Sequence, residues 1–254
     1  MTPAAQAELE AIGTIHALAL AVDDKDHYTR NHSERVALYA TAVAVHIGLP
    51  IEHIEQIAIA GTLHDVGKLA VPDSVLLRPG PLTREEAQLV QRHSEAGERM
   101  VLALGLEEIG TWIRHHHERW DGHGYPDGLA GERIPLPSRI LGAADALDAM
   151  TTARAYHQAL SLEEATHELV EHAEQQFDPQ VAACLIELLE DGSLSLFEER
   201  RVVTSYTIGS PLVTSTPTTV NGFATHCSRP ASAGRTALPR SPSHLRSEAP
   251  LCGR

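Results

Sequence analysis

Apolar residues recur at intervals of three and four along most of the chain, and this spacing is typical of amphipathic helices. Residues 51–66 show it most clearly, because Ile54 and Ile57 lie on one continuous apolar stripe. Only short runs near 134–136 and 202–206 have any strand character, so the pattern predicts an all-α protein. We expect helices over residues 5–22, 31–47, 51–66, 83–103, 106–117, 137–150, 161–174 and 178–190.

Capping residues support several of these helix ends. The segments Thr83-Arg-Glu-Glu86 and Ser161-Leu-Glu-Glu164 have the capping-box pattern that opens a helix. Asp178, followed by proline, is typical of an N-cap with proline at the first helical position. Gly48 and Gly67 follow apolar stripes, so we expect each to end a helix as the residue just past its last turn.

The composition changes sharply near residue 202. Residues 202–254 contain 16 Ser or Thr, 6 Pro and 4 Gly, but no Lys and no Asp. Such a segment buries too little apolar surface to offset its chain entropy, so we expect a disordered, low-complexity tail. The tail has a net charge of +4, which leaves −18 on residues 1–201.

The overall composition excludes several classes of protein. A formal net charge of −14 argues against a sequence-independent nucleic-acid binder, which needs a basic face. No apolar run reaches the roughly 18 residues of a membrane span, and the acidic N-terminus does not resemble a secretory signal. The cysteines, Cys184, Cys227 and Cys252, are too few and too widely spaced for a disulfide framework or a cysteine-based zinc site.

Histidine is unusually abundant, with 16 residues against 20 lysines and arginines together. Imidazole and carboxylate groups are ligands of borderline divalent metals such as iron, manganese, zinc and nickel. The candidate donors share a place inside or at the end of a predicted helix, and they are His32, His64, Asp65, His93, His116, His117 and Asp145. This set is large enough for two metals, with one carboxylate bridging ions about 3.5–4 Å apart.

Each candidate also has an ordinary interpretation. A single helical histidine such as His32 or His93 is more often a hydrogen-bonded side chain than a ligand. Asp145 could instead form an ion pair with an arginine. His116 and His117 point about 100° apart on a regular helix, so they can reach one metal only near a helix end. The donor set becomes persuasive only as a whole.

The order and spacing of these motifs resemble the HD-GYP domain, a subgroup of the HD metal-dependent phosphohydrolases. The resemblance runs from about Tyr28 to Asp178 and implies an HD-domain helical bundle with an HD-GYP extension over residues 5–201, followed by the tail over 202–254. The matching motifs are Tyr28-Thr-Arg-Asn-His32, His64-Asp-Val-Gly-Lys68, His116-His-Glu118, Asp121-Gly-His-Gly-Tyr-Pro126, Ile134-Pro-Leu-Pro-Ser-Arg-Ile140, Asp145, Arg154-Ala-Tyr156 and Phe177-Asp-Pro179.

The resemblance implies a bacterial cytoplasmic enzyme that hydrolyses cyclic di-GMP to pGpG, to GMP, or to both. It implies two divalent metals, most often iron or manganese. One metal would be held by His32, His64, Asp65 and Asp145, and the other by Asp65, His93, His116 and His117. Some members bind a third metal through a glutamate, but this chain has Tyr28 at that position. We therefore expect a two-metal centre.

The resemblance also assigns the substrate contacts. Asp65 and Lys68 would be catalytic, with Lys68 touching the scissile phosphate, while Tyr125 and Arg154 would contact the nucleotide. Proline after Tyr125 restricts that residue to extended conformations, which suits a ring presented for stacking, although the ring could equally pack the loop. Where members often have lysine, this chain has His157, which changes one phosphate or guanine contact.

Two other functions stay open. One is a catalytically weak receptor that uses the same fold to bind signalling domains such as diguanylate cyclases. The other is a phosphohydrolase for a different cyclic dinucleotide. A homodimer is compatible with an exposed helix face, but no sequence pattern requires one.

Overall fold

The computed structural model describes residues 13–15, 17–22, 25, 31–153 and 158–194. Within these ranges the regular elements are all helical, so the predicted all-α class is confirmed. No helix in the same ranges is long and apolar enough to cross a membrane. The predicted tail, its boundary with the domain and the start of the first predicted helix lie outside the described residues.

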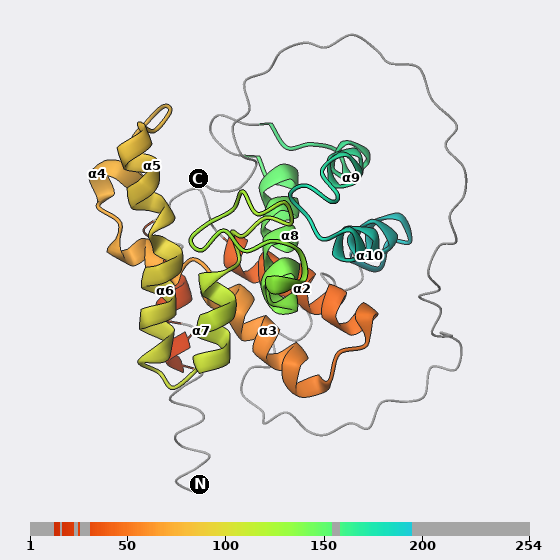
Figure 1. Cartoon of the computed structure of the whole chain (residues 1–254), viewed down its shortest axis with the longest axis horizontal. Helices are drawn as coiled ribbons and strands as arrows, with labels where there is room; N and C mark the ends of the chain where they lie inside the picture. Colours follow the sequence, from red (N-terminus) through yellow and green to blue (C-terminus); the bar gives the residue numbers. More distant parts are fainter. Residues whose placement is uncertain (1–12, 16, 23–24, 26–30, 154–157, 195–254) are drawn as a thin grey trace, which may run out of the picture.

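The helices pack around α8, which lies at the centre of the molecule (Figure 1). It contacts α2, α3, α7, α9 and α10, while α6 packs on α7. In chain order, the elements are α2 (His32–Ile47), α3 (Ile51–Leu63), the 3-10 turn η1 (Val66–Ala70), α4 (Asp73–Leu76), α5 (Arg84–Gln91), α6 (His93–Leu102), α7 (Glu107–Arg114), the 3-10 turn η2 (Gly131–Arg133), α8 (Leu136–Thr151), α9 (Leu162–Glu171) and α10 (Pro179–Glu190).

The sequence of α8 explains its central place. Three of its alanines, Ala143, Ala144 and Ala146, are buried and let neighbouring helices approach closely. Gly142 shows how close this approach is, because a Cβ atom there would lie 2.5 Å from the carbonyl oxygen of His116. The helix therefore brings its buried face directly against the turn that carries one of the candidate ligands.

Several predicted helix ends are confirmed. The hydroxyl of Thr83 accepts a hydrogen bond from the Glu86 amide at 3.2 Å, and the Glu86 carboxylate accepts one from the Thr83 amide at 2.8 Å. Ser161 forms the same reciprocal capping box at the start of α9. Asp178 caps α10, and Gly48 ends α2 in the left-handed conformation. Local sequence was sufficient at these ends because the capping contacts are themselves local.

The single helix predicted over 83–103 is wrong, because the structure breaks it at Arg92 into α5 and α6. His93 Nδ1 donates a hydrogen bond to the carbonyl of Val90 at 2.7 Å. The hydroxyl of Ser94 likewise binds the carbonyl three residues before it. These side chains occupy carbonyls that an unbroken helix would use, and the break places His93 at the start of a new helix.

The prediction that Gly67 ends a helix over 51–66 is also wrong. The helix α3 ends at Leu63, and Gly67 lies inside η1 without a positive φ. Its lack of a side chain serves a close approach, since a Cβ atom would lie 1.8 Å from the carbonyl oxygen of His93 and 2.5 Å from the amide of Gly97. This contact joins η1 to α6.

We expect the Gly67→Ala substitution to lower the free energy of unfolding by about 1–3 kcal/mol or more, because the new methyl group meets backbone atoms that cannot move aside cheaply. Urea denaturation would measure the change. The matched control is Gly110→Ala in α7, where the added Cβ meets its neighbours at 3.5 Å or more. That control should be neutral or gain about 0.5–1 kcal/mol from helix propensity. Equal effects of the two substitutions would contradict the close-approach argument.

Candidate metal centre

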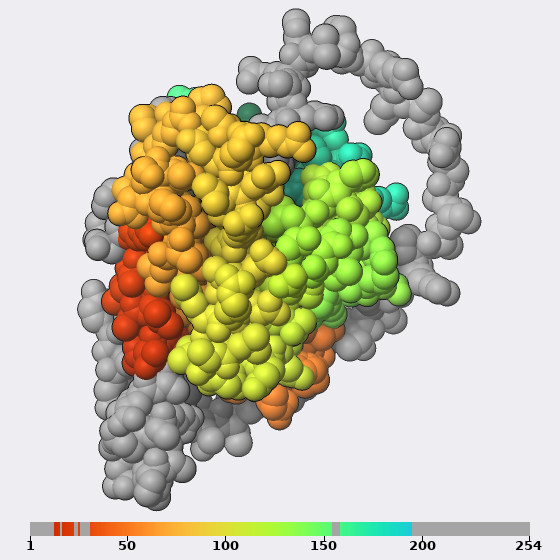
Figure 2. Space-filling model, turned by 60° about the vertical axis from the view of Figure 1, so that its left-hand side comes forward, coloured from red at the N-terminus to blue at the C-terminus, as the bar shows by residue number. Residues whose placement is uncertain are grey.

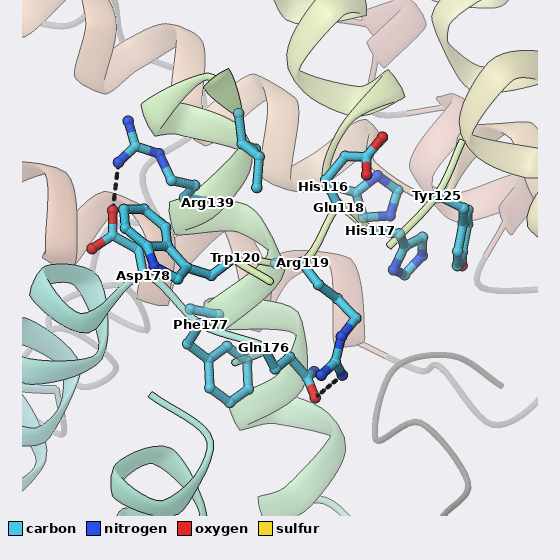
Figure 3. A pocket seen from close by; sticks show the side chains of 13 residues that line it. His116, His117, Glu118, Arg119, Trp120, Tyr125, Arg139, Gln176, Phe177 and Asp178 are labelled. Carbon is cyan, nitrogen blue, oxygen red and sulfur yellow. Dashed lines mark hydrogen bonds and ion pairs between the residues drawn. The ribbon is translucent and has the colours of Figure 1, made fainter. Parts of the chain in front are cut away.

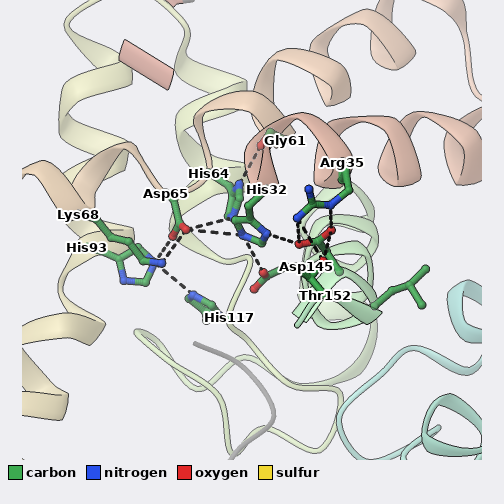
Figure 4. Close-up of polar contacts among 12 residues, drawn as sticks. His32, Arg35, Gly61, His64, Asp65, Lys68, His93, His117, Asp145 and Thr152 are labelled. Atoms are coloured by element: carbon green, nitrogen blue, oxygen red, sulfur yellow. Dashed lines mark hydrogen bonds and ion pairs between the residues drawn. The ribbon is translucent and has the colours of Figure 1, made fainter. Parts of the chain in front are cut away.

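The side chains predicted as metal ligands converge in the interior from segments far apart in the chain, and Figure 4 labels all of them except His116. Each of them is exposed by 6% or less. They come from α2, from the turn after α3, from the start of α6, from the turn after α7 and from the middle of α8, in the order His32, His64 with Asp65, His93, His116 with His117, and Asp145.

A first group of donors surrounds one oxygen of Asp65. Donor atoms of His32, His64 and Asp65 lie within 4.8 Å of one another. His64 Nε2 is 3.5 Å and His32 Nε2 is 3.8 Å from Asp65 Oδ2. Asp145 joins this group, because its Oδ1 lies 3.2 Å from His32 Nε2. Two imidazoles and two carboxylates therefore meet at one point.

A second group lies on the other side of the same carboxylate. Donor atoms of His93, His116 and His117 are also within 4.8 Å of one another. The Nε2 atoms of His93 and His117 are 3.1 Å apart, and His93 Nε2 lies 3.5 Å from Asp65 Oδ1. The two oxygens of Asp65 thus face different groups, which is the arrangement that a bridging carboxylate needs.

Three of the histidines are oriented by the backbone in the same way. Each donates from Nδ1 to the carbonyl three residues earlier, at 2.8 Å for His64, 2.7 Å for His93 and 2.6 Å for His116. A hydrogen bond from Nδ1 sets the tautomer and leaves the lone pair on Nε2. Their rings are therefore held ready to act as ligands.

Buried ring nitrogens without hydrogen bonds indicate that the donor set suits a divalent cation. Among the buried side-chain atoms of the described residues, Nε2 of His64, Nε2 of His116 and Nδ1 of His117 make no hydrogen bond. A buried polar atom without a partner costs about 1–3 kcal/mol, so such atoms seldom gather without a reason. Nitrogen and carboxylate donors around these atoms are the ligands that borderline metals prefer.

The adjacent His116 and His117 reach one group because α7 is shorter than predicted. The helix ends at Arg114 rather than at residue 117, so both histidines lie in the turn that follows. Their ring centroids are 3.9 Å apart at an angle of 42°. The hydroxyl of Ser138 binds the carbonyl of Trp112 and so takes an acceptor that a longer helix would use.

Asp148 is a site residue that the sequence analysis missed. Its buried carboxylate accepts a hydrogen bond from His32 Nδ1 at 2.6 Å and is also bound by the guanidinium of Arg35. Hydrogen bonds of this kind orient a metal-ligating histidine. The sequence does indicate this residue, because Asp148 lies three residues after the predicted ligand Asp145 and so shares one face of α8 with it.

Lys68 also lies within the cluster. It extends from η1 and is 4% exposed, and its Nζ donates to Asp65 Oδ2 at 2.7 Å. Burial would raise the pKa of Asp65, but the Lys68 ammonium and the neighbouring histidines hold it well below its usual range. Asp65 is therefore an ionised carboxylate. The role of Lys68 toward a phosphate stays a prediction.

Tyr125 lies beside the second group of donors (Figure 3). Its half-buried ring is 4.8 Å from the ring of His117, and its amide donates to the His117 carbonyl at 3.2 Å. The ring therefore lies at the edge of the donor cluster, but its contact with a nucleotide stays a prediction. Arg154 and His157 lie outside the described residues.

A cavity of about 50 Å³ lies behind the turn that carries His116 and His117 (Figure 3). Trp120 and Arg139 line it, and the Arg139 guanidinium lies 5.7 Å from the Trp120 ring centroid and binds Asp178. Ligand pockets usually measure about 300–1,000 Å³, so this space is far too small for a nucleotide.

The buried histidines differ in the direction in which their pKa values are shifted. Removal from water lowers the pKa of His116 to about 3 and that of His117 well below its usual range, with the neighbouring imidazoles adding to both shifts. Burial also lowers the pKa of His32, but hydrogen bonds to Asp145 and Asp148 outweigh it and raise this pKa to about 9. The second group is therefore neutral near pH 7, as metal ligation requires.

Comparison with known families decides the classification. Residues 17–181 match the family described as HD domain, which is more than half of the chain. The chain belongs to the HD-domain family. HD-domain phosphohydrolases depend on metals, and the two buried donor groups described above could hold metal in this HD domain.

Curated relatives of this HD-domain chain act on cyclic dinucleotides. The cyclic di-GMP phosphodiesterase response regulator RpfG of Xanthomonas campestris pv. campestris is 40% identical over 176 residues, which cover 68% of this chain and 47% of the relative. The 3'3'-cGAMP-specific phosphodiesterase 1 of Vibrio cholerae is 40% identical over 148 residues, covering 58% and 34%. The chain thus spans half or less of these relatives. Their similarity confirms the resemblance to the HD-GYP group.

A solved structure confirms the fold of this HD domain. The crystal structure of a cyclic GMP-AMP-specific phosphodiesterase of Vibrio cholerae superposes with a TM-score of 0.61. The superposition covers 78% of this chain and 53% of the other, at 20% sequence identity. At that identity the likeness concerns the helical architecture alone, and it supports the predicted HD-domain bundle.

The buried histidines predict how stability depends on pH in metal-free protein. His116 has a pKa of about 3 in the folded chain against 6.5 unfolded, and the pKa values of His93 and His117 are lowered as well. The unfolded state therefore binds more protons between these values, and the free energy of unfolding falls as pH drops from 6.5 toward 3. Each of these histidines contributes up to about 1.4 kcal/mol per pH unit to the slope of the free energy of unfolding. Urea midpoints at pH 7, 6 and 5 would measure the slope.

Two variants sharpen this measurement. His116→Gln should flatten the slope, whereas His167→Gln, whose native side chain is 76% exposed, should leave it unchanged. His32 affects the free energy of unfolding in a different pH range. Its raised pKa contributes stability that is complete below pH 6.5 and is lost as pH rises through about 9. A midpoint that stays constant from pH 7 to pH 5 would contradict the neutral buried cluster.

Proposed function

We propose that this chain is a metal-dependent phosphodiesterase that hydrolyses cyclic di-GMP to pGpG, to GMP, or to both. The observation that carries the proposal is the convergence of buried imidazoles on the ionised carboxylate of Asp65, with three buried ring nitrogens left without hydrogen bonds. Such a set serves no purpose in a purely structural helical bundle, because each unpaired nitrogen costs stability. The names of the curated relatives support the substrate class.

In this proposal the two donor groups on either side of Asp65 would hold two divalent metals. The first donor group, with Asp145, would hold one ion and the second group would hold the other, and the resemblance to the HD-GYP group favours iron or manganese. When bound, such ions neutralise the phosphodiester and lower the pKa of water toward about 7. The proposed ligands are His32, His64, Asp65 and Asp145 for one metal, and Asp65, His93, His116 and His117 for the other.

The remaining chemistry falls to side chains of the chain itself. Lys68 binds the scissile phosphate and stabilises the negative charge that develops in the transition state. Its ion pair with Asp65 holds the ammonium at the cluster before substrate arrives. Asp148, itself bound by Arg35, keeps the His32 ring oriented.

The nucleotide is held by residues at the edge of the cluster. Tyr125 stacks on a guanine, a contact worth about 1–3 kcal/mol per base in single-stranded sites. Its position beside His117 supports this role, because the base would then lie next to the reacting phosphate. The contribution of Arg154 rests on the sequence motif alone.

The broader setting follows from the same proposal. The substrate is a bacterial second messenger, which places the chain in the bacterial cytoplasm and makes diguanylate cyclases and other signalling domains candidate partners. A homodimer is compatible with it. The main alternative activity is hydrolysis of 3'3'-cGAMP, because several relatives are named as phosphodiesterases of that dinucleotide. A weak receptor is less favoured, since every proposed ligand position carries a suitable donor.

Two substitutions separate metal binding from phosphate binding. We expect Asp65→Asn to abolish turnover of cyclic di-GMP and to lower the bound metal, because the shared carboxylate loses its charge. Lys68→Ala should retain metal while kcat falls about 10²–10³-fold, as for other charge-stabilising groups. Product chromatography and metal quantification on anaerobically purified protein would measure both. An unchanged rate in Asp65→Asn would refute the mechanism, and metal loss in Lys68→Ala would refute the role of Lys68.

The choice of substrate needs a direct comparison. We expect metal-loaded protein to hydrolyse cyclic di-GMP with a higher kcat/KM than 3'3'-cGAMP when both are assayed with the same metal. The reverse order would replace the proposed substrate but keep the reaction class. Tight binding of cyclic di-GMP without turnover, under iron and under manganese, would instead establish the receptor function.

A further inference from the structure

The loop that carries Tyr125 folds tightly between α7 and η2. Gly122 and Gly128 have φ values of 82° and 64°, which glycine adopts without strain. Gly124 has no positive φ, but a Cβ atom there would lie 2.3 Å from the amide of Arg119. The loop therefore turns back onto the segment that follows His117. Side-chain contacts with neighbouring segments hold the loop in this position.

One such contact comes from inside the molecule. The carboxylate of Glu118, which is 8% exposed, accepts hydrogen bonds from the amides of Asp127 at 2.7 Å and Leu129 at 3.1 Å. Glu118 directly follows His117 in the chain. The backbone on the far side of Tyr125 is thus tied to the turn that carries the second donor group.

A second contact holds the same loop from outside. Arg114, the last residue of α7, binds Asp127 through two parallel hydrogen bonds, from Nε to Oδ2 at 2.8 Å and from Nη2 to Oδ1 at 2.9 Å. His115 Nε2 lies 2.9 Å from the same Oδ2. The hydrogen bonds from Arg114 lower the pKa of Asp127 to about 2, so the pair is ionised at neutral pH.

The same guanidinium reaches a third segment. Arg114 Nη1 donates to Glu98 Oε2 on α6 at 2.8 Å. Figure 2 shows α6, α7 and the loop after α7 as adjoining parts of one face of the molecule. One planar side chain therefore fixes the angle at which the loop leaves α7, because a bidentate pair constrains direction as well as distance.

We propose that Arg114 and Asp127 are positioning residues that hold the Tyr125 loop against the donor cluster, so that the aromatic ring is in place when a cyclic dinucleotide binds. This inference rests on the proposed function and deepens it. Neither residue reaches the cluster itself, so both act through Tyr125. Arginine is suited to the position because lysine cannot form the two parallel bonds.

The test compares Asp127→Asn and Arg114→Lys with wild-type protein loaded with metal. Both variants should raise KM for cyclic di-GMP roughly three- to tenfold, keep kcat within about twofold and retain bound metal, since a partly exposed pair is of modest strength. Amide hydrogen exchange in residues 121–129 should become faster. The matched control is Arg78→Gln, which breaks the Arg78–Glu86 pair between the segment after α4 and helix α5, and which should change neither KM nor the exchange rate of residues 121–129.

The outcomes are distinguishable. An unchanged KM in both variants, or a fall in kcat with loss of metal, would overturn the positioning role. Exchange in residues 121–129 that matches wild type would overturn it as well, whether or not the protein is active. Absence of turnover in wild-type protein would refute the proposed function, and the exchange measurement would then decide by itself whether this ion pair holds the loop.

Discussion

The buried carboxylate of Asp65 is the interaction on which the rest of the site depends. An isolated charge in the interior is costly, so its neighbours must compensate it. Here the Lys68 ammonium binds one oxygen, and the imidazoles of the adjacent His64 and of two other segments approach the two oxygens. Because each of these groups is itself buried, none can be removed without leaving another unpaired. The helices that carry them are therefore coupled through a single side chain.

Close backbone packing makes this convergence possible. Gly67 lets η1 touch the start of α6, and Gly142 lets α8 touch the turn after α7. A side chain at either place would separate segments whose donors must lie within a few ångströms. The hydrogen bonds from ring Nδ1 atoms to carbonyls, and from His32 to Asp148, then set the direction in which each ring points.

The helical class, the capping boxes and the motif residues were predictable, whereas the internal helix ends were not. The capping boxes at Thr83 and Ser161 use contacts within four residues, so local sequence contains them completely. The break at Arg92 and the early end of α7 arise where side chains take backbone carbonyls that a helix would otherwise use. Apolar periodicity does not report such competition. The spacing of Asp148 from Asp145 places both on one face of α8, but its role was missed because its partner His32 lies 116 residues away.

The sequence by itself determined which residues are candidate metal ligands, because their types, order and spacing match a known pattern of metal-ligating side chains. It also determined that these residues lie inside helices or just past their ends, because apolar periodicity is a local property. Only the tertiary structure decided that both oxygens of Asp65 face separate donor groups, and that Arg114 joins α6, α7 and the loop of Tyr125. Those relations depend on distances between segments remote in the chain, and such distances arise only when the helices pack.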